Sequence, residues 1–369
     1  MINRAKKGRA RDFGLEFSGV PGSHNAITDV DGVLVGYETL SSHNNSALET
    51  NGIPIQTGVT AILPRGTSRV PKPVWAGIHA FNGNGEMTGS HWIRDGGYFV
   101  GPVMITNSHS VGAVHDAATR WIIDTYADAW HDNHLWAMPV VAETYDGVLN
   151  DINGQHVRPE HAYKALQSAK AGHIAEGNVG GGAGMICYEF KGGTGTASRQ
   201  IEIDGQTFLL GVLVQANHGL RPWLKIQGQT VGPQMMQNRI PGIDGERGSI
   251  IAVLATDMPL QPLQLNKLAR RGAIGIGRGG TAGGNNSGDI FLAFSTANEM
   301  ELPQLSGPWR QFVSLNDELL DAVYMAAIDA IEEAIVNAMV AAEPVPTARP
   351  AGHFCQVLDI ELLKKALGN

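Results

Sequence analysis

Short runs of apolar residues, separated by glycine, proline and polar residues, recur along the chain and predict β-strands. They lie at residues 32–37, 58–63, 100–106, 137–144, 184–190, 207–216, 249–256 and 289–296. Several of these runs are apolar at nearly every position rather than at every second one. A strand of that kind needs cover on both faces, so the pattern favours sheets layered between helices.

Apolar residues with helical spacing lie between some of these runs. The clearest helix is predicted at residues 316–342, after Ser314, which with Asp317 resembles a capping box. Further helices are predicted at residues 111–130, 159–172, 260–271 and 358–367. Glycine-rich stretches at 180–184, 191–199 and 275–289 lack the spacing of phosphate-binding motifs. They are interpreted as tight loops and close backbone contacts.

Composition and charge narrow the class of protein. The chain has 369 residues, 43% of them hydrophobic, which is enough for the core of one α/β domain. Its net charge of −8 argues against nucleic-acid binding, and no apolar run approaches the roughly 18 residues that span a membrane. Two cysteines are too few for a disulfide framework, which favours a cytoplasmic setting. His131 and His134 lack the spacing of a zinc site, so no metal or other cofactor is predicted.

Ser249 stands where a polar loop becomes an uninterrupted apolar run. A hydroxyl at this junction has the chemistry to attack the carbonyl of Gly248, where glycine tolerates a strained backbone. Hydrolysis of the resulting ester would leave Ser249 as a new amino terminus, with a nucleophile and a candidate base in one residue. The two pieces, residues 1–248 and 249–369, are expected to stay interlocked in a single domain. The alternative is an ordinary Gly-Ser turn, as at Gly22-Ser23 and Gly89-Ser90.

Other polar residues lie at the ends of predicted strands. Ser287 and Asp289 fall on one side of an extended chain and are suited to relay a proton. Asn217 is suited to donate to an oxyanion, Glu143 to bind a substrate ammonium, and Tyr145 to donate to an oxyanion. Each has an alternative interpretation as a turn or surface residue.

Taken in order, several of these motifs resemble one known family. They are the segments 25–33, 143–147 and 191–199, together with Asn217, Gly248-Ser249 and the segment 287–289. The chain resembles the DmpA-type L-aminopeptidase/D-esterase/amidase group, which includes the β-peptidyl aminopeptidases. The resemblance implies an αββα sandwich like that of N-terminal nucleophile hydrolases with different strand connectivity, self-cleavage at Gly248-Ser249, and a homo-oligomer of four or more chains. It implies substrates with a free amine, namely short peptides and amino-acid amides or esters.

The same resemblance implies a role for each matching residue. Ser249 is the nucleophile, and Ser287 and Asp289 orient it, although the family varies between Asp and Glu at the position of Asp289. Tyr145 and Asn217 steady the oxyanion. The two substrate-binding residues are then Glu143, which binds the free amine, and Trp136, which forms a wall of the pocket. The general base is either the amine of Ser249 or the Ser287 relay.

Two rival functions remain at the level of sequence. The first is an acyltransferase like the ornithine acetyltransferases, which pass the acyl group to an amine and use threonine where Ser249 stands. The second is a binding protein without enzymatic activity, whose glycine-rich loops hold a ligand in an uncut chain.

Overall fold

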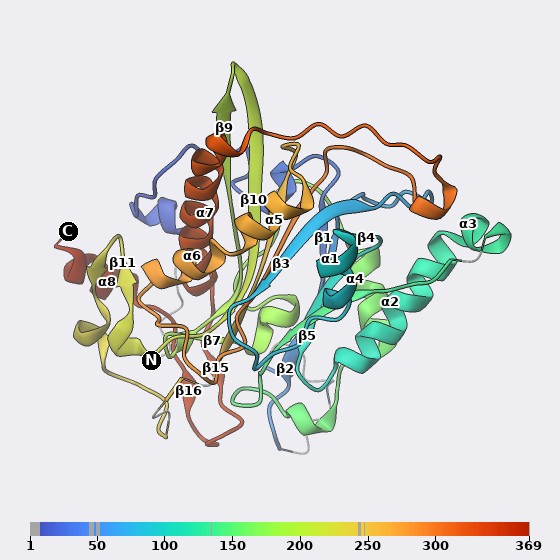
Figure 1. Ribbon diagram of the computed structural model, residues 1–369. Helices are drawn as coiled ribbons and strands as arrows, with labels where there is room; N and C mark the ends of the chain where they lie inside the picture. Colours follow the sequence, from blue (N-terminus) through green and yellow to red (C-terminus); the bar gives the residue numbers. More distant parts are fainter. Residues whose placement is uncertain are drawn as a thin grey trace.

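Two β-sheets lie face to face, and helices cover the outer face of each (Figure 1). The computed structural model describes residues 8–43, 48, 52–133, 135–242, 245–246 and 248–368. Among these residues, no helix combines the length and the apolar character needed to cross a bilayer. His134, one of the two histidines weighed as a metal ligand, lies outside the described residues.

The smaller sheet has four strands in the order β1 (Leu34–Ser41), β2 (Gln56–Leu63), β5 (Val103–Asn107) and β6 (Val140–Thr144). Only β5 and β6 run parallel. Its outer face is covered by α2 (Val111–Thr125) and α4 (Pro159–Gln167), which bury an apolar core against β2 and β5.

The larger sheet has six strands in the order β4 (Tyr98–Phe99), β3 (Val74–Ala80), β14 (Ile290–Ser295), β13 (Ser249–Thr256), β10 (Gln206–Asn217) and β9 (Gly193–Ile203). Its outer face carries α5 (Pro262–Ala269), α6 (Gly272–Arg278) and α7 (Leu320–Val340). β13 and β14 run parallel at the centre, and the other neighbours are antiparallel.

Strand β13 is apolar from Ile250 to Ala255 because it contacts a core on each of its faces. Ile250, Ala252 and Leu254 belong to the core under α5 and α7. The alternate residues, Ile251, Val253 and Ala255, belong to the core between the two sheets. Both faces of the strand are therefore buried, as predicted, and the four layers form an αββα sandwich.

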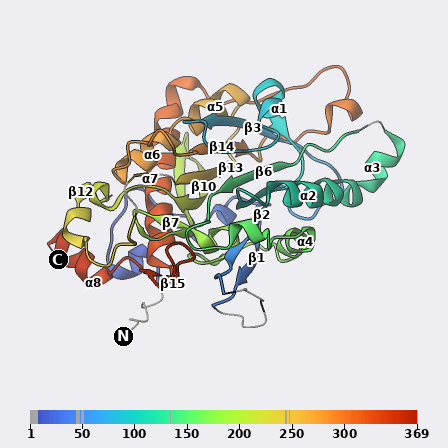
Figure 2. The ribbon, with the colours of Figure 1, turned by 90° about the horizontal axis from the view of Figure 1, so that it is seen from below.

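Shorter elements complete the fold at its edges (Figure 2). They are α1 (Ser90–Gly96), α3 (Ala127–Asp132), α8 (Ile360–Leu367), and the paired short strands β7 (Ile186–Cys187) with β8 (Phe190–Lys191), β11 (Lys225–Ile226) with β12 (Gln229–Thr230), and β15 (Val345–Pro346) with β16 (Phe354–Cys355).

Several of the predicted elements need correction. The strand predicted at 184–190 is a tight hairpin of β7 and β8, because Tyr188 and Glu189 adopt left-handed backbone angles that break an extended strand. The helix predicted at 111–130 breaks at Tyr126 into α2 and α3. Strand β9 replaces part of the stretch interpreted as loops at 191–199, and α6 covers the start of the one at 275–289. Asn316, rather than Ser314, caps the turn that precedes α7.

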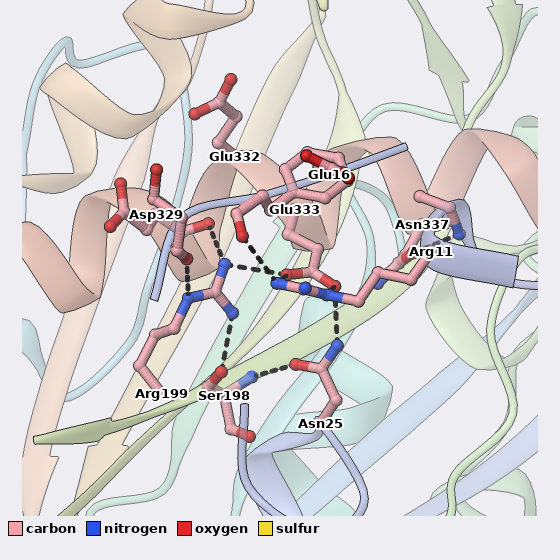
Figure 3. Close-up of polar contacts among 12 residues, drawn as sticks. Arg11, Glu16, Asn25, Ser198, Arg199, Asp329, Glu332, Glu333 and Asn337 are labelled. Carbon is pink, nitrogen blue, oxygen red and sulfur yellow. Dashed lines mark hydrogen bonds and ion pairs between the residues drawn. The ribbon is translucent and has the colours of Figure 1, made fainter. Parts of the chain in front are cut away.

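A polar network holds β9 to α7 and to the N-terminal segment (Figure 3). Arg199 on β9 and Glu333 on α7 form an ion pair of 2.8 Å, and both side chains are almost wholly buried. Arg11 makes a second ion pair of 2.7 Å with the same carboxylate. Burial raises the pKa of Glu333, but the hydrogen bond from Arg11 and the charge of Arg199 outweigh it, so the net pKa is lowered.

Candidate active site

Ser249 is the first residue of β13 and pairs directly with Asn217, the last residue of β10. Side chains alternate along a strand, so Ser249 lies on the same face as Ile251, which belongs to the core between the sheets. Only 4% of Ser249 and 6% of Asn217 is exposed. Ser249 and Asn217 therefore lie at one end of the core between the two sheets.

Both polar atoms of the Asn217 side chain make hydrogen bonds. Its oxygen accepts a hydrogen bond of 2.8 Å from the backbone of Ile186, and its nitrogen donates one of 2.9 Å to the carbonyl of Tyr145. Tyr145 follows β6 of the opposite sheet, so this amide connects the two sheets beside Ser249. An amide nitrogen has two N–H groups, and one contact to Tyr145 leaves the second for another acceptor.

Gly248 lies so close to the backbone of Asn217 that there is no room for a side chain. A Cβ atom built there would overlap the backbone carbonyl oxygen of Asn217. The bond between Gly248 and Ser249 is thus held directly against the end of β10. A larger residue at 248 would push the chain away from Asn217.

Ser287 and Asp289 come together as predicted from their spacing. The hydroxyl of Ser287 donates to the carboxylate of Asp289 at 2.6 Å, and the backbone N–H of Ile250 donates to the same oxygen at 3.2 Å. Asn82 holds Asp289 from the other side. Its side-chain oxygen accepts from the backbone N–H of Asp289 at 2.7 Å, and its side-chain nitrogen donates to the second carboxylate oxygen at 3.2 Å. Burial raises the pKa of Asp289, and the hydrogen bonds from Ser287 and Asn82 oppose that rise.

Glu143 is the next-to-last residue of β6, and both of its carboxylate oxygens accept hydrogen bonds. One accepts from the backbone of Glu86 at 3.0 Å and the other from the hydroxyl of Ser108. Burial raises the pKa of Glu143, and these hydrogen bonds oppose the rise. A Cβ atom on Gly85 would lie 3.5 Å from this carboxylate and 3.2 Å from the Cα of Gly288, so Glu143 lies close to the Ser287 loop.

A cavity of about 270 Å³ opens beside the Gly248-Ser249 bond. Tyr145, Asn217 and Gly248 contribute to its wall, and Tyr145 is 39% exposed there. The other lining residues include Ile186, Glu189, His218, Pro241, Glu246 and Arg349. Trp136 lies elsewhere, in a separate aromatic hollow with Trp92, Tyr98 and Trp130. The structure therefore brings Tyr145 to the cavity and leaves Trp136 outside its wall.

Comparison with known proteins identifies the family. The model of peptidase family S58 matches residues 25–351. The chain belongs to peptidase family S58. A curated relative, the β-peptidyl aminopeptidase BapA of Sphingosinicella microcystinivorans, is 51% identical over 91% of this chain and 86% of its own.

Solved structures of similar proteins agree with this S58 assignment. One is the L-aminopeptidase D-Ala-esterase/amidase of Ochrobactrum anthropi, a prototype of the serine aminopeptidases with a variant Ntn hydrolase fold. It is 54% identical, with a TM-score of 0.93 and 98% of each chain covered. A β-aminopeptidase of Burkholderia sp. is 43% identical, with a TM-score of 0.87 and again 98% of each chain covered. The chain is thus an S58 aminopeptidase with a serine nucleophile, which excludes a non-enzymatic binding protein.

The S58 site also contains residues that sequence reasoning missed. Asn82, which supports Asp289, lies in the segment Asn82-Gly83-Asn84-Gly85, whose composition indicates only a turn. Glu246 stands three residues before Ser249 in a loop where a single carboxylate gives no signal. His218 follows Asn217 and lines the cavity. Burial lowers the pKa of His218 to about 3, so its ring is neutral at physiological pH.

Proposed function

We propose that this S58 aminopeptidase activates itself by cleaving the bond between Gly248 and Ser249. What carries the proposal is the placement of Ser249: a buried serine opens a central strand beside Asn217, and a cavity opens at the preceding glycine. Attack of the Ser249 hydroxyl on the Gly248 carbonyl converts the peptide bond into an ester. Water then hydrolyses the ester and leaves residues 1–248 and 249–369 as separate chains.

The exposed amino terminus then acts on substrate in the same place. The Ser249 hydroxyl attacks the scissile carbonyl, and its proton passes to its own amine or to Ser287 and Asp289. The second N–H of the Asn217 amide and the phenol of Tyr145 donate to the oxyanion. Collapse of the tetrahedral intermediate releases the amine product and leaves an acyl-enzyme, which water then hydrolyses. None of these steps calls for a metal ion.

We propose substrates that carry a free amine, namely short peptides and amino-acid amides or esters. The Glu143 carboxylate lies beside the Ser287 loop, where it is suited to pair with the substrate ammonium. A positive charge next to this buried carboxylate would offset the burial that raises its pKa. The two hydrogen bonds from Ser108 and Glu86 keep Glu143 in one orientation for that contact.

Replacing the nucleophile tests the proposal. Ser249→Ala is expected to remain one uncut, inactive chain, whereas the wild type yields two fragments on denaturing electrophoresis, the smaller beginning at Ser249 by Edman sequencing. Ser90→Ala is the control, because Ser90 also follows a glycine but opens α1. Hydrolysis of an aminoacyl p-nitroanilide without an acceptor amine excludes a pure acyltransferase. Cleavage at the same bond in Ser249→Ala would contradict the proposal.

We also propose that the enzyme is a homo-oligomer of four or more chains. Support comes from large apolar side chains left exposed on the segment 303–313, where Trp309 is 91% exposed and Val313 is 66% exposed. Exposed apolar residues in such a group are typical of contact surfaces. Light scattering after size exclusion should give at least four times the chain mass for the wild type and a lower mass for Trp309→Ser.

A further inference from the structure

The carboxylate of Glu246 joins three segments of the active site. One oxygen accepts from the backbone N–H of Gly219 at 2.7 Å and from the hydroxyl of Thr281 at 3.1 Å. The other accepts from the backbone N–H of Gly284 at 3.0 Å. Hydrogen bonds to an ionised acceptor are among the stronger ones in proteins.

These partners connect the residues used in the chemistry. Gly219 lies two residues after Asn217, and Gly284 lies three residues before Ser287. Glu246 itself lies two residues before Gly248. The contact at Gly284 leaves no room for a side chain, because a Cβ there would approach the Glu246 carboxylate to 2.5 Å.

The chain is therefore held at one described residue on each side of Gly248. Glu246 is fixed by its carboxylate, and Ser249 is fixed in the ladder opposite Asn217. Gly248 lies between these points, against the carbonyl of Asn217. Gly248 is two residues from one fixed point and next to the other, which limits how far its carbonyl can move from the serine hydroxyl.

We propose that Glu246 is a positioning residue for self-cleavage, which holds the Gly248 carbonyl within reach of the Ser249 hydroxyl. The inference rests on the proposed self-cleavage at this bond. In the attack, the bond from Ser249 Oγ to the Gly248 carbon forms, the peptide C–N bond breaks, and the proton moves from oxygen to nitrogen. Glu246 takes no part in that exchange and acts only through placement of the chain.

After cleavage the same contacts join the two pieces. Glu246 belongs to residues 1–248, whereas Thr281 and Gly284 belong to residues 249–369. The carboxylate thus keeps the new end of the larger piece at the cavity wall, which Glu246 itself lines.

The rate of self-cleavage in freshly purified protein tests this role. Glu246→Ala is expected to slow the appearance of the two fragments about a hundredfold, the scale of a misplaced reacting group. Glu246→Gln keeps one acceptor and is expected to cut at an intermediate rate. Glu202→Gln is the control, because this exposed carboxylate contacts only Thr207 in the β9–β10 hairpin among the hydrogen bonds described. Hydroxylamine, which cleaves esters, should not restore cutting, since the slowed step precedes the ester.

Folding is measured separately in a Ser249→Ala background, where every chain stays uncut. An unchanged thermal midpoint with slow cutting supports a positioning role. If Glu246→Ala does not fold, two other variants test the role. They are Glu246→Gln and Gly284→Ala, whose added methyl group displaces the carboxylate. Variants that cut at the wild-type rate overturn the inference and leave self-cleavage intact. A wild type that never cuts instead overturns the proposed self-cleavage on which the inference rests.

Discussion

The amide group of Asn217 makes two structural contacts and, in our proposal, also donates to the oxyanion. It fixes the chain at Ile186 and Tyr145, and its remaining N–H is available to an oxyanion. We expect Asn217→Ala to lower kcat about a hundredfold or more in the protein that has cut, with a smaller effect on KM. Asn178→Ala is the control, because that amide contacts only the backbone of Glu343 near the surface in the described hydrogen bonds. An unchanged kcat would remove Asn217 from the oxyanion site.

Asp146, directly after Tyr145, makes stability depend on pH. Burial raises the pKa of Asp146 to about 7, although nearby hydrogen bonds oppose the rise. In the unfolded chain the pKa of an aspartate is about 3.9. Between these values only the unfolded state loses the proton, so stability contributed by this group falls as pH rises from about 4 to about 7.

We therefore expect Asp146→Asn, which cannot ionise, to gain stability relative to the wild-type residue across that window. Thermal midpoints at pH 5 and pH 8, in a Ser249→Ala background, measure the difference. The gain should be larger at pH 8. Equal differences at both values would show that the carboxylate is not protonated in the folded protein.

Sequence spacing predicted some site residues and could not predict others. Ser287 and Asp289 are two residues apart, and the structure joins them by a hydrogen bond. Tyr145 follows the last residue of β6, so strand alternation does not place it relative to Glu143. Asn82 and Glu246 reach the site from distant or irregular segments, where a single polar residue has no pattern around it.

At the scale of elements, β9 shows why a strand escapes prediction. Its first half is Gly-Thr-Gly-Thr-Ala-Ser-Arg, without apolar alternation. The strand is nonetheless buried, because α7 lies on it so closely that a Cβ on Gly195 would overlap the carbonyl of Ala334. The long helix α7 and the strands β10, β13 and β14 were predictable from their own apolar patterns.

The pairing of β9 with α7 depends on a buried charge. Removing Arg199 leaves the Glu333 carboxylate with Arg11 as its remaining cationic partner in the described network. We expect Arg199→Met to lower the free energy of unfolding by about 3–5 kcal/mol, the range for breaking a buried ion pair. Denaturant titration of uncut protein measures this, with Arg69→Met at an exposed position as the control. A loss below about 1 kcal/mol would mean that solvent reaches the carboxylate.

At the scale of the whole molecule, the layers follow from strands that are apolar on both faces. The order of the strands does not, because it depends on contacts between residues far apart in the chain. β3 pairs with β14 across more than half of the sequence, and no local pattern in either strand indicates that partner. The likeness to known structures supplies this connectivity, through the shared variant of the Ntn hydrolase fold.

This strand order determines what the proposed self-cleavage would do to the molecule. β13 and β14, from the smaller piece, lie side by side between β10 and β3 of the larger one. A cut before Ser249 frees the start of β13 and leaves the strand pairings on both sides intact. Each piece alone would expose strand edges and the apolar residues of two core layers.

We therefore expect the cut pieces to migrate together on size exclusion in native buffer and to separate only in denaturant. Residues 249–369 expressed alone should be unfolded by circular dichroism, whereas uncut Ser249→Ala protein should show the full secondary structure. Separation in native buffer would mean that the central sheet does not hold the pieces together. Joint migration instead means that the new amino terminus stays in the sheet beside Asn217, where an N-terminal nucleophile has to be held to act on substrate.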